Sequence, residues 1–123
     1  EPRIGRVRAL LIFLALVVVA LVGWPSREMD PDDPRRQTGE RGVVMLSAEW
    51  CGYCDAMRRD LERGGVSYQE WDIEHDARGT LAFEALDARG VPVLVVGQEW
   101  QAGYSPQLVQ SMLVAAGHSP RAP

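Results

Sequence analysis

The sequence contains no lysine and no asparagine, so all 13 of its basic residues are arginines. Codons for both missing residues are rich in A and T, and we therefore expect a GC-rich, bacterial genome. Cysteine is scarce as well, with Cys51 and Cys54 as the only two. A zinc site needs about four Cys or His ligands, and only His75 and His118 are available to join the pair. We favour a redox pair over a zinc site, and over a purely structural disulfide, because closing so short a loop adds little stability.

The charge balance excludes one class of partner. Between Glu40 and Ala116 the chain has 12 acidic residues and 6 arginines, a net charge of −6. Nucleic-acid binding relies on a basic surface, so we expect no nucleic-acid partner. Hydrophobic residues make up 46% of the chain, which argues against disorder, and 123 residues allow one domain plus an appendage.

The appendage is an apolar run, Ala9–Gly23, which has no polar side chain and follows Arg3, Arg6 and Arg8. Its length lies between a signal-peptide core of about 7–15 residues and a membrane span of about 17–25. Flanking arginines and Trp24 can extend the span by lying at the membrane interface. Small residues suited to a cleavage site are poorly placed. We therefore predict that residues 1–24 are an uncleaved signal anchor, the alternative being export as a soluble protein after cleavage.

Arginines before a span stay on the cytoplasmic side. The prediction is thus a single-pass protein of the bacterial inner membrane, with its domain facing the periplasm or the cell exterior. Because the sequence begins with Glu1 and not Met, we expect residues upstream of it. Residues 25–41 contain Pro25, Pro31 and Pro34 with few apolar side chains. They predict a flexible tether of about 20–25 Å.

Residues 42–117 predict a small α/β domain, followed by a tail over 118–123. Apolar or alternating runs predict strands over Val43–Ala48, Val66–Ile73, Val91–Val96 and Glu99–Ala102. Amphipathic stripes predict helices over about Gly52–Arg63, around Leu81, Ala82, Ala85 and Leu86, and from Pro106, capped by Ser105, to Ala116. The order β-α-β-α-β-β-α predicts a four-stranded mixed sheet with flanking helices, a parallel first pair and a closing hairpin.

Cys51 falls at the turn between the first strand and the first helix of this domain. Free N–H groups and the helix dipole favour a thiolate there. Cys54 follows one helical turn later, close enough for a hydrogen bond or a disulfide. We predict that Cys51 is the exposed nucleophile and that Cys54 is buried and keeps its proton longer.

The Cys51-Gly52-Tyr53-Cys54 dithiol, together with this order of elements, resembles the thioredoxin superfamily at glutaredoxin size. Arg89–Leu94 is similar to the segment that carries the superfamily's cis-proline, here Pro92, and Trp100–Pro106 is similar to the closing segment of glutaredoxin-like electron donors for ribonucleotide reductase. The resemblance implies thiol–disulfide oxidoreductase activity with Cys51 and Cys54 as catalytic residues. The substrate-binding residues that we predict with it are Trp50, Tyr53, Val91, Pro92, Gly103 and Tyr104. For Trp50 and Tyr53 there are two interpretations: they line a substrate groove, or they only shield the sulfurs.

The sequence also departs from the patterns of these families. Met45 stands where thioredoxins have a buried Asp, so only water is left to take the proton of Cys54. Glu49-Trp50 and Ala102–Ser105 replace a Lys and a Gly-Gly-x-Asp that serve glutathione in many glutaredoxins, although Arg58 occupies a position that is often basic. The expected partners are protein or low-molecular-weight disulfides, with no metal and no required cofactor, and glutathione is the reductant that the resemblance offers. The alternative function is a glutathione-binding or iron–sulfur carrier, which Gly52 after the first cysteine permits.

Overall fold

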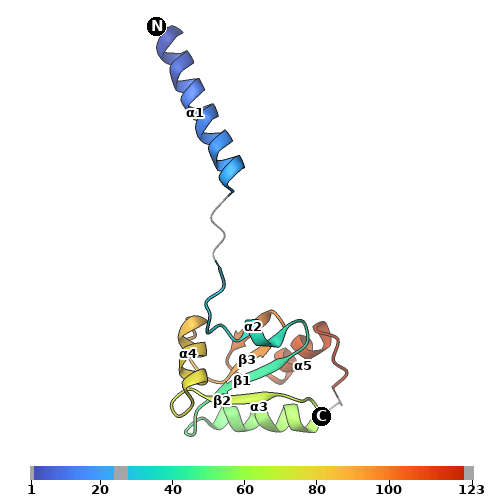
Figure 1. The fold of residues 1–123 in the computed structure, drawn as a ribbon. Helices are drawn as coiled ribbons and strands as arrows, with labels where there is room; N and C mark the ends of the chain where they lie inside the picture. Colours follow the sequence, from blue (N-terminus) through green and yellow to red (C-terminus); the bar gives the residue numbers. More distant parts are fainter. Residues whose placement is uncertain (1, 24–27, 121–123) are drawn as a thin grey trace.

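The structure is a computed structural model that describes residues 2–23 and 28–120. Along the chain the elements are α1 (Pro2–Val22), α2 (Arg35–Thr38), β1 (Val43–Ser47), α3 (Gly52–Arg63), β2 (Gln69–Asp72), α4 (Ala77–Ala85), β3 (Val93–Val96), β4 (Glu99–Ala102) and α5 (Pro106–Ala115) (Figure 1). Trp24, which we predicted to lie at a membrane interface, is outside the described residues, as are Pro25 and residues 121–123 of the tail.

The four strands form one mixed sheet in the order β2-β1-β3-β4. Strand β1 runs parallel to β2 and antiparallel to β3, and β3 pairs antiparallel with β4. In this register Met45 lies opposite Leu94, and Val44 opposite Val95. The predicted fold class and order of elements are therefore confirmed.

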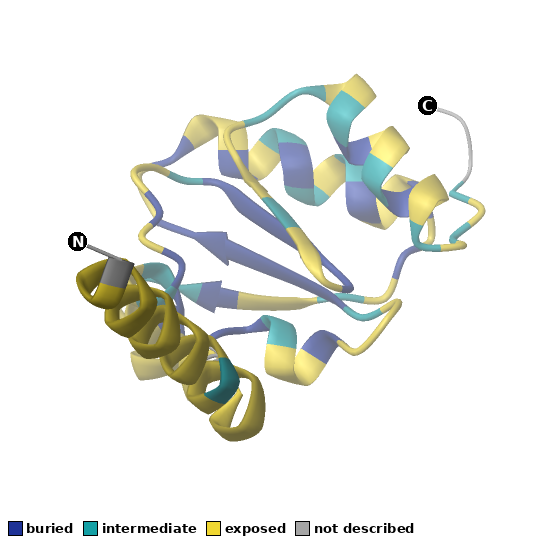
Figure 2. Cartoon of the chain, turned by 90° about the horizontal axis from the view of Figure 1, so that it is seen from above, coloured by how far each residue is buried: buried dark blue, intermediate teal, exposed yellow. Residues whose placement is uncertain are grey.

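Strands β1 and β3 are buried along their whole length because helices cover both faces of the sheet (Figure 2). Alternate residues face opposite ways. Met45 and Leu94 belong to a core cluster with residues of α3 and α5, whereas Val44 and Val95 belong to a second cluster with residues of α4. The continuous apolar runs in the sequence follow from this double coverage. Both cysteines belong to the cluster of α3 and α5.

Helix α4 differs from its predicted pattern. Asp76 caps its first turn, with the side chain accepting the N–H of Arg78, and this fixes which residues face the sheet. Ala82 is buried and Phe83 packs against the core, but Leu81 is exposed, so the prediction that Leu81 belongs to the apolar stripe was wrong. Whether a residue at the edge of an apolar stripe faces the sheet or the solvent depends on where the helix starts. The sequence pattern located the start of this helix only approximately.

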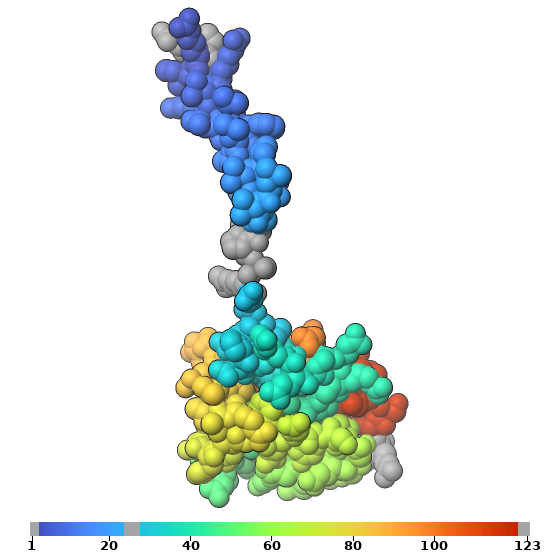
Figure 3. All heavy atoms as spheres, viewed as in Figure 1, coloured from blue at the N-terminus to red at the C-terminus, as the bar shows by residue number. Residues whose placement is uncertain are grey.

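The segment predicted as a tether is partly folded. Asp33 is buried and pairs with Arg35, and the Thr38 hydroxyl donates a hydrogen bond to the carbonyl of Gly97. The Gln98 amide donates to the carbonyls of Arg35, at 3.0 Å, and Gly39, at 2.6 Å. In Figure 3 this segment, cyan to teal, lies beside the orange atoms of the turn between β3 and β4. Residues from Asp33 onward therefore pack on the domain, and the polar composition that predicted a tether gave no sign of this contact.

Helix α1 contains the three arginines and the apolar run predicted to cross a membrane. Within the described residues it provides one stretch, Arg3–Val22, that is long and apolar enough to span a bilayer, and a signal sequence would meet the same criterion. Almost all of its described side chains are exposed. The sequence prediction of an N-terminal apolar helix is confirmed.

Candidate active site

Cys51 is the N-cap residue of α3 and therefore lies where β1 passes into this helix. Its backbone is extended, with φ −94° and ψ 105°, and its N–H donates to the carbonyl of Ala48 at 3.2 Å. The sulfur of Cys51 accepts a hydrogen bond from the N–H of Cys54 at 3.1 Å. A sulfur in this position receives one of the N–H groups that a helix leaves unpaired at its start. The geometry is the one that favours a thiolate once the disulfide is reduced.

The two cysteines form a disulfide across 5.3 Å between their Cα atoms. Cys54 is completely buried, in agreement with its predicted place on the inner face of α3. Cys51 retains an exposed fraction of only 6% and packs in the same cluster. Cys51 is thus the more accessible of the two, but it is less exposed than we predicted, because it packs among the buried side chains of the core cluster.

Two aromatic residues adjoin the cysteines in the chain, and a third lies beside one of them. Trp50 and Tyr53 precede the two cysteines and are 71% and 69% exposed. The ring of Tyr53 lies 6.3 Å from that of Tyr104 at an angle of 30°, and the Tyr104 hydroxyl donates to the carboxylate of Asp60. This hydrogen bond raises the pKa of Tyr104. Of the three aromatic residues predicted from the sequence, Trp50 and Tyr53 therefore lie at the surface beside the cysteines, and the partly buried Tyr104 lies beside Tyr53.

The segment before β3 contributes backbone groups to the same region. The Val91–Pro92 peptide bond is cis, and the carbonyl of Pro92 accepts the N–H of Gly103 at 2.8 Å. Gly103 has a φ of +97°, which other residues rarely adopt. Val91 and Tyr104 pack against the core cluster that contains both cysteines. Of the six predicted substrate-binding residues, Trp50 and Tyr53 flank the cysteines in the chain, Val91 and Tyr104 pack against their cluster, and Pro92 and Gly103 adjoin these two in the chain. Their roles remain a prediction.

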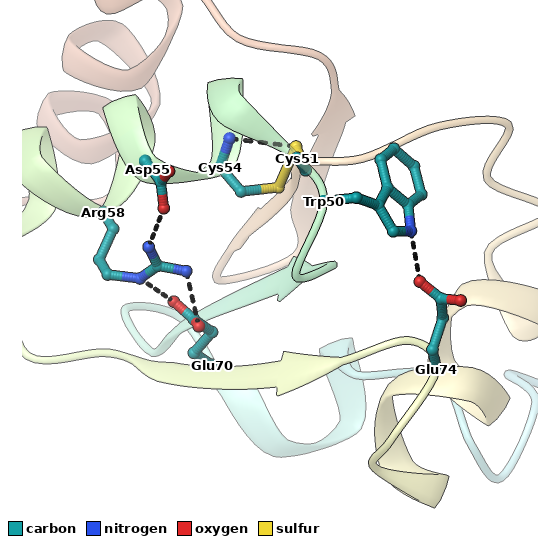
Figure 4. Close-up of a disulfide and its surroundings, with 7 residues drawn as sticks. All are labelled: Trp50, Cys51, Cys54, Asp55, Arg58, Glu70 and Glu74. Atoms are coloured by element: carbon teal, nitrogen blue, oxygen red, sulfur yellow. Dashed lines mark hydrogen bonds and ion pairs between the residues drawn. A yellow bond between two sulfur atoms is a disulfide. The ribbon is translucent and has the colours of Figure 1, made fainter.

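Charged residues on β2 and α3 complete the region, and only Arg58 among them was noted in the sequence. Its guanidinium pairs with Glu70 and with Asp55, so the pKa of Arg58 is raised, mainly by the hydrogen bond to Glu70 (Figure 4). A depression beside the disulfide turn is lined by Ser47, Ala48, Glu49, Asp55, Arg58, Glu70 and Asp72. Glu70 belongs to the alternating run Val66–Ile73 that predicted β2, and the structure places it on the exposed side of that strand.

The loop between β2 and α4 brings a further carboxylate to the site, which sequence reasoning missed. Glu74 accepts a hydrogen bond from the indole N–H of Trp50 (Figure 4). Asp72 shapes the loop by accepting the N–H groups of Glu74 at 2.7 Å and His75 at 2.9 Å, and these contacts lower the pKa of Asp72. His75 lies on the surface before α4, and its side-chain bond to Asp72 raises its pKa. In the described part of the chain no group of three or more His, Cys, Asp or Glu side chains could hold a metal.

Comparison with known proteins agrees with this geometry. The glutaredoxin family model matches residues 43–100. NrdH-redoxin from Escherichia coli, a glutaredoxin-like protein with a thioredoxin-like activity profile, has 20% identity and a TM-score of 0.52 over 56% of this chain and 91% of its own. A buckwheat glutaredoxin–glutathione complex has 21% identity and a TM-score of 0.55 over 68% of this chain and 86% of its own. A glutaredoxin from Archaeoglobus fulgidus has 19% identity and a TM-score of 0.54 over 72% of this chain and 98% of its own. Curated protein sequences gave no match.

Together these findings define a class of protein. The folded part has the thioredoxin-like fold and resembles glutaredoxins, as the sequence indicated. A Cys-x-x-Cys pair that forms a disulfide at the start of α3 supports a redox function.

Proposed function

We propose that the protein is a membrane-tethered thiol–disulfide oxidoreductase that cycles Cys51 and Cys54 between dithiol and disulfide. The observation that carries the proposal is the position of the Cys51 sulfur, which caps α3 and accepts the N–H of Cys54. Helix N-terminal N–H groups and the helix dipole stabilise a thiolate, which is the nucleophile in disulfide exchange.

In the reducing direction the Cys51 thiolate attacks one sulfur of a substrate disulfide. The Cys51–substrate bond forms as the substrate S–S bond breaks, and the released substrate thiolate takes up a proton. Cys54 then loses its proton and attacks the Cys51 sulfur, which releases the second substrate thiolate and forms the Cys51–Cys54 disulfide. Two electrons pass to the substrate. Met45 lies in the buried cluster with Cys54, at the position where thioredoxins have an Asp. In the proposed mechanism water therefore accepts the proton of Cys54. Oxidation of a substrate dithiol follows the same steps in reverse, and the redox potential sets the direction.

The aromatic surface around the disulfide supports protein disulfides as substrates. Trp50 and Tyr53 offer exposed apolar area next to the sulfurs, which a polypeptide chain can cover. The backbone of Pro92 and Gly103 is the proposed partner for the main chain of the substrate, since the neighbouring Val91 and Tyr104 pack against the cluster that contains both cysteines. Glutathione is a less favoured reductant because Arg58, the basic residue that follows the dithiol, is already paired with Glu70 and Asp55.

The catalytic proposal is tested by the reduction of insulin disulfides with dithiothreitol as electron donor. The full chain in mild detergent should accelerate the reaction, and Cys51→Ser should remove the acceleration. If Cys51→Ser and the wild type were equally active, the proposal would be wrong.

A carrier of iron–sulfur clusters is the alternative function. There is open space above Gly52, so the backbone after Cys51 does not obstruct a ligand. Clusters of this type, as the family resemblance implies, need glutathione, and the ion pairs of Arg58 leave that residue poorly suited to hold it. A brown protein with visible absorbance would support the carrier, whereas a colourless protein active on insulin supports the oxidoreductase.

We further propose that α1 spans the bacterial inner membrane and anchors the domain on its outer side, facing the periplasm or the cell exterior. The arginines at its start and the apolar stretch Arg3–Val22 support this topology. A reporter that is active only outside the cytoplasm should be active when fused after Pro123. Activity of a cytoplasmic reporter alone would contradict the assignment.

A further inference from the structure

We propose that Glu74 is a positioning residue: it fixes the indole of Trp50 beside Cys51, so that the indole forms a preorganised wall for polypeptide substrates. This inference rests on the proposed oxidoreductase function. Glu74 itself touches neither sulfur in Figure 4 and acts through Trp50.

The contact between these residues is the first observation. Trp50 is 71% exposed, so core packing does little to hold its large side chain. Its indole N–H donates to the Glu74 carboxylate, which comes from the loop after β2. In Figure 4 the indole extends toward Glu74, on the other side of the turn from the pair of Arg58 and Glu70. Hydrogen bonds to a charged acceptor are stronger than those between neutral groups.

The loop that carries Glu74 is itself held in place, which is the second observation. The Asp72 carboxylate accepts the N–H of Glu74 at 2.7 Å, and the Asp72 carbonyl accepts the N–H of Asp76 at 3.1 Å. The N–H of Ile73 donates to the carbonyl of Ser47 at 2.9 Å, so the loop is joined to the end of β1. Cys51 follows that strand by only four residues. The acceptor and the nucleophile are thus fixed to the same end of the sheet.

Preorganisation explains why such a contact would matter for binding. A substrate that must first order an exposed side chain loses affinity, because rotamer freedom is lost on association. With Glu74 in place the indole is already ordered. A polypeptide that lies along this surface gains from the fixed indole, whereas a small disulfide that reaches only the sulfurs does not.

Substitution of Glu74 can remove its hydrogen bond with Trp50 without disturbing other contacts of the loop. The Glu74 side chain has no other hydrogen bond or ion pair within residues 2–23 and 28–120, and its backbone N–H remains bonded to Asp72 in any variant. Glu74→Ala therefore deletes the acceptor and leaves the loop intact. Glu74→Gln keeps an acceptor oxygen without the charge. Glu84→Ala removes an exposed carboxylate from α4, on the opposite face of the sheet, and is the matched control.

The experiment compares these full-length variants in detergent with insulin and with 2-hydroxyethyl disulfide, a small uncharged substrate. Glu74→Ala should raise KM for insulin about two- to tenfold and leave kcat, and both constants for the small disulfide, unchanged. Glu74→Gln should recover part of the loss, and Glu84→Ala should match the wild type. In ¹⁵N–¹H spectra the indole signal of Trp50, assigned with Trp50→Phe, should shift in Glu74→Ala. In a Trp50→Phe background Glu74→Ala should have no further effect.

Three results would overturn the inference: an unchanged KM for insulin, an equal loss with both substrates, or an indole signal that Glu74→Ala does not move. A wild-type protein without activity on either disulfide would instead overturn the proposed function, and with it the role given to Trp50. The indole shift still reports whether Glu74 holds Trp50, so the two failures are distinguishable.

Discussion

Arg58 donates two hydrogen bonds to the carboxylate of Glu70, from Nε to Oε1 at 2.7 Å and from Nη2 to Oε2 at 2.9 Å. Its remaining nitrogen, Nη1, donates to Asp55 at 2.6 Å. One cation is therefore shared by two carboxylates beside the disulfide. Glu49 and Asp72 line the same depression, which leaves it with a net negative charge. Anionic substrates meet repulsion at this side of the site, whereas neutral or basic polypeptide segments do not.

Releasing Arg58 should improve the use of an anionic disulfide. Glu70→Gln removes one carboxylate and frees two guanidinium N–H groups, so the rate with glutathione disulfide should rise about two- to fivefold at low salt. The gain should shrink as salt is added, because exposed charges are screened. Initial rates with glutathione disulfide measure the effect, with Glu84→Gln as the control for a lost carboxylate on α4. An unchanged rate in Glu70→Gln would show that Arg58 has no part in substrate choice.

Gly79 is required by a close approach between α4 and the end of β2. A Cβ atom there would lie 2.3 Å from the carbonyl oxygen of Asp72 and 2.6 Å from its carbonyl carbon, so the backbone would have to move. Gly79→Ala should therefore lower the free energy of unfolding by about 1–3 kcal/mol, despite the better helix propensity of Ala. Gly90→Ala, where no atom lies within 4 Å of the new Cβ, should have little effect. Urea unfolding of both variants gives the comparison. Equal stability would contradict the close approach.

The contact of Thr38 with the turn after β3 should stabilise the domain. Thr38→Val keeps the shape of this buried side chain but leaves the Gly97 carbonyl without its donor. The expected loss is about 1–3 kcal/mol, measured by urea unfolding. Ser67→Ala, which removes an exposed hydroxyl, is the control. If Thr38→Val were as stable as Ser67→Ala, residues 33–41 would be a tether after all.

The loop that carries Glu74 should respond to pH through Asp72 and His75. The pKa of His75 is raised above 6.5, chiefly by its bond to Asp72, so this contact contributes fully below pH 6.5 and is lost as the pH rises through the folded-state pKa. The pKa of Asp72 is lowered below 3.8, chiefly by the N–H of Glu74, so its contribution is present above pH 3.8 and is lost as the pH falls through the lowered value. An NMR titration of His75 should have its midpoint above 6.5, and Asp72→Asn should move the midpoint down. A midpoint that Asp72→Asn leaves in place would contradict the pairing.

Apolar pattern and turn chemistry carried the prediction of the fold. The apolar runs at Val43–Ala48 and Val91–Val96 predicted strands, which the structure shows as β1 and β3, and Ser105 followed by Pro106 marked the start of α5. These signals are local, because burial and capping depend on residue type and spacing. They also placed Cys51 at the turn between β1 and α3.

The sequence did not predict the polar contacts of the site or those of residues 33–41. Trp50 and Glu74 are 24 residues apart, and Thr38 and Gly97 are 59 apart. Such contacts depend on the register of the strands and on loop shape, which residue type alone does not reveal. Gly79 illustrates the difference: in the sequence it only weakens a helix, whereas in the structure it lets α4 approach Asp72.

The division of roles between the two sulfurs is the central claim, and capture of a mixed disulfide tests it most directly. Full-length Cys54→Ser and Cys51→Ser are expressed in membranes, free thiols are blocked, and covalent adducts are identified by mass spectrometry, with the double Ser variant as control. Cys51 caps α3 and keeps some exposure, while Cys54 is completely buried. Cys54→Ser should therefore accumulate adducts through Cys51, because attack proceeds and resolution does not. Adducts that accumulate instead on Cys54 of the Cys51→Ser variant would contradict the account.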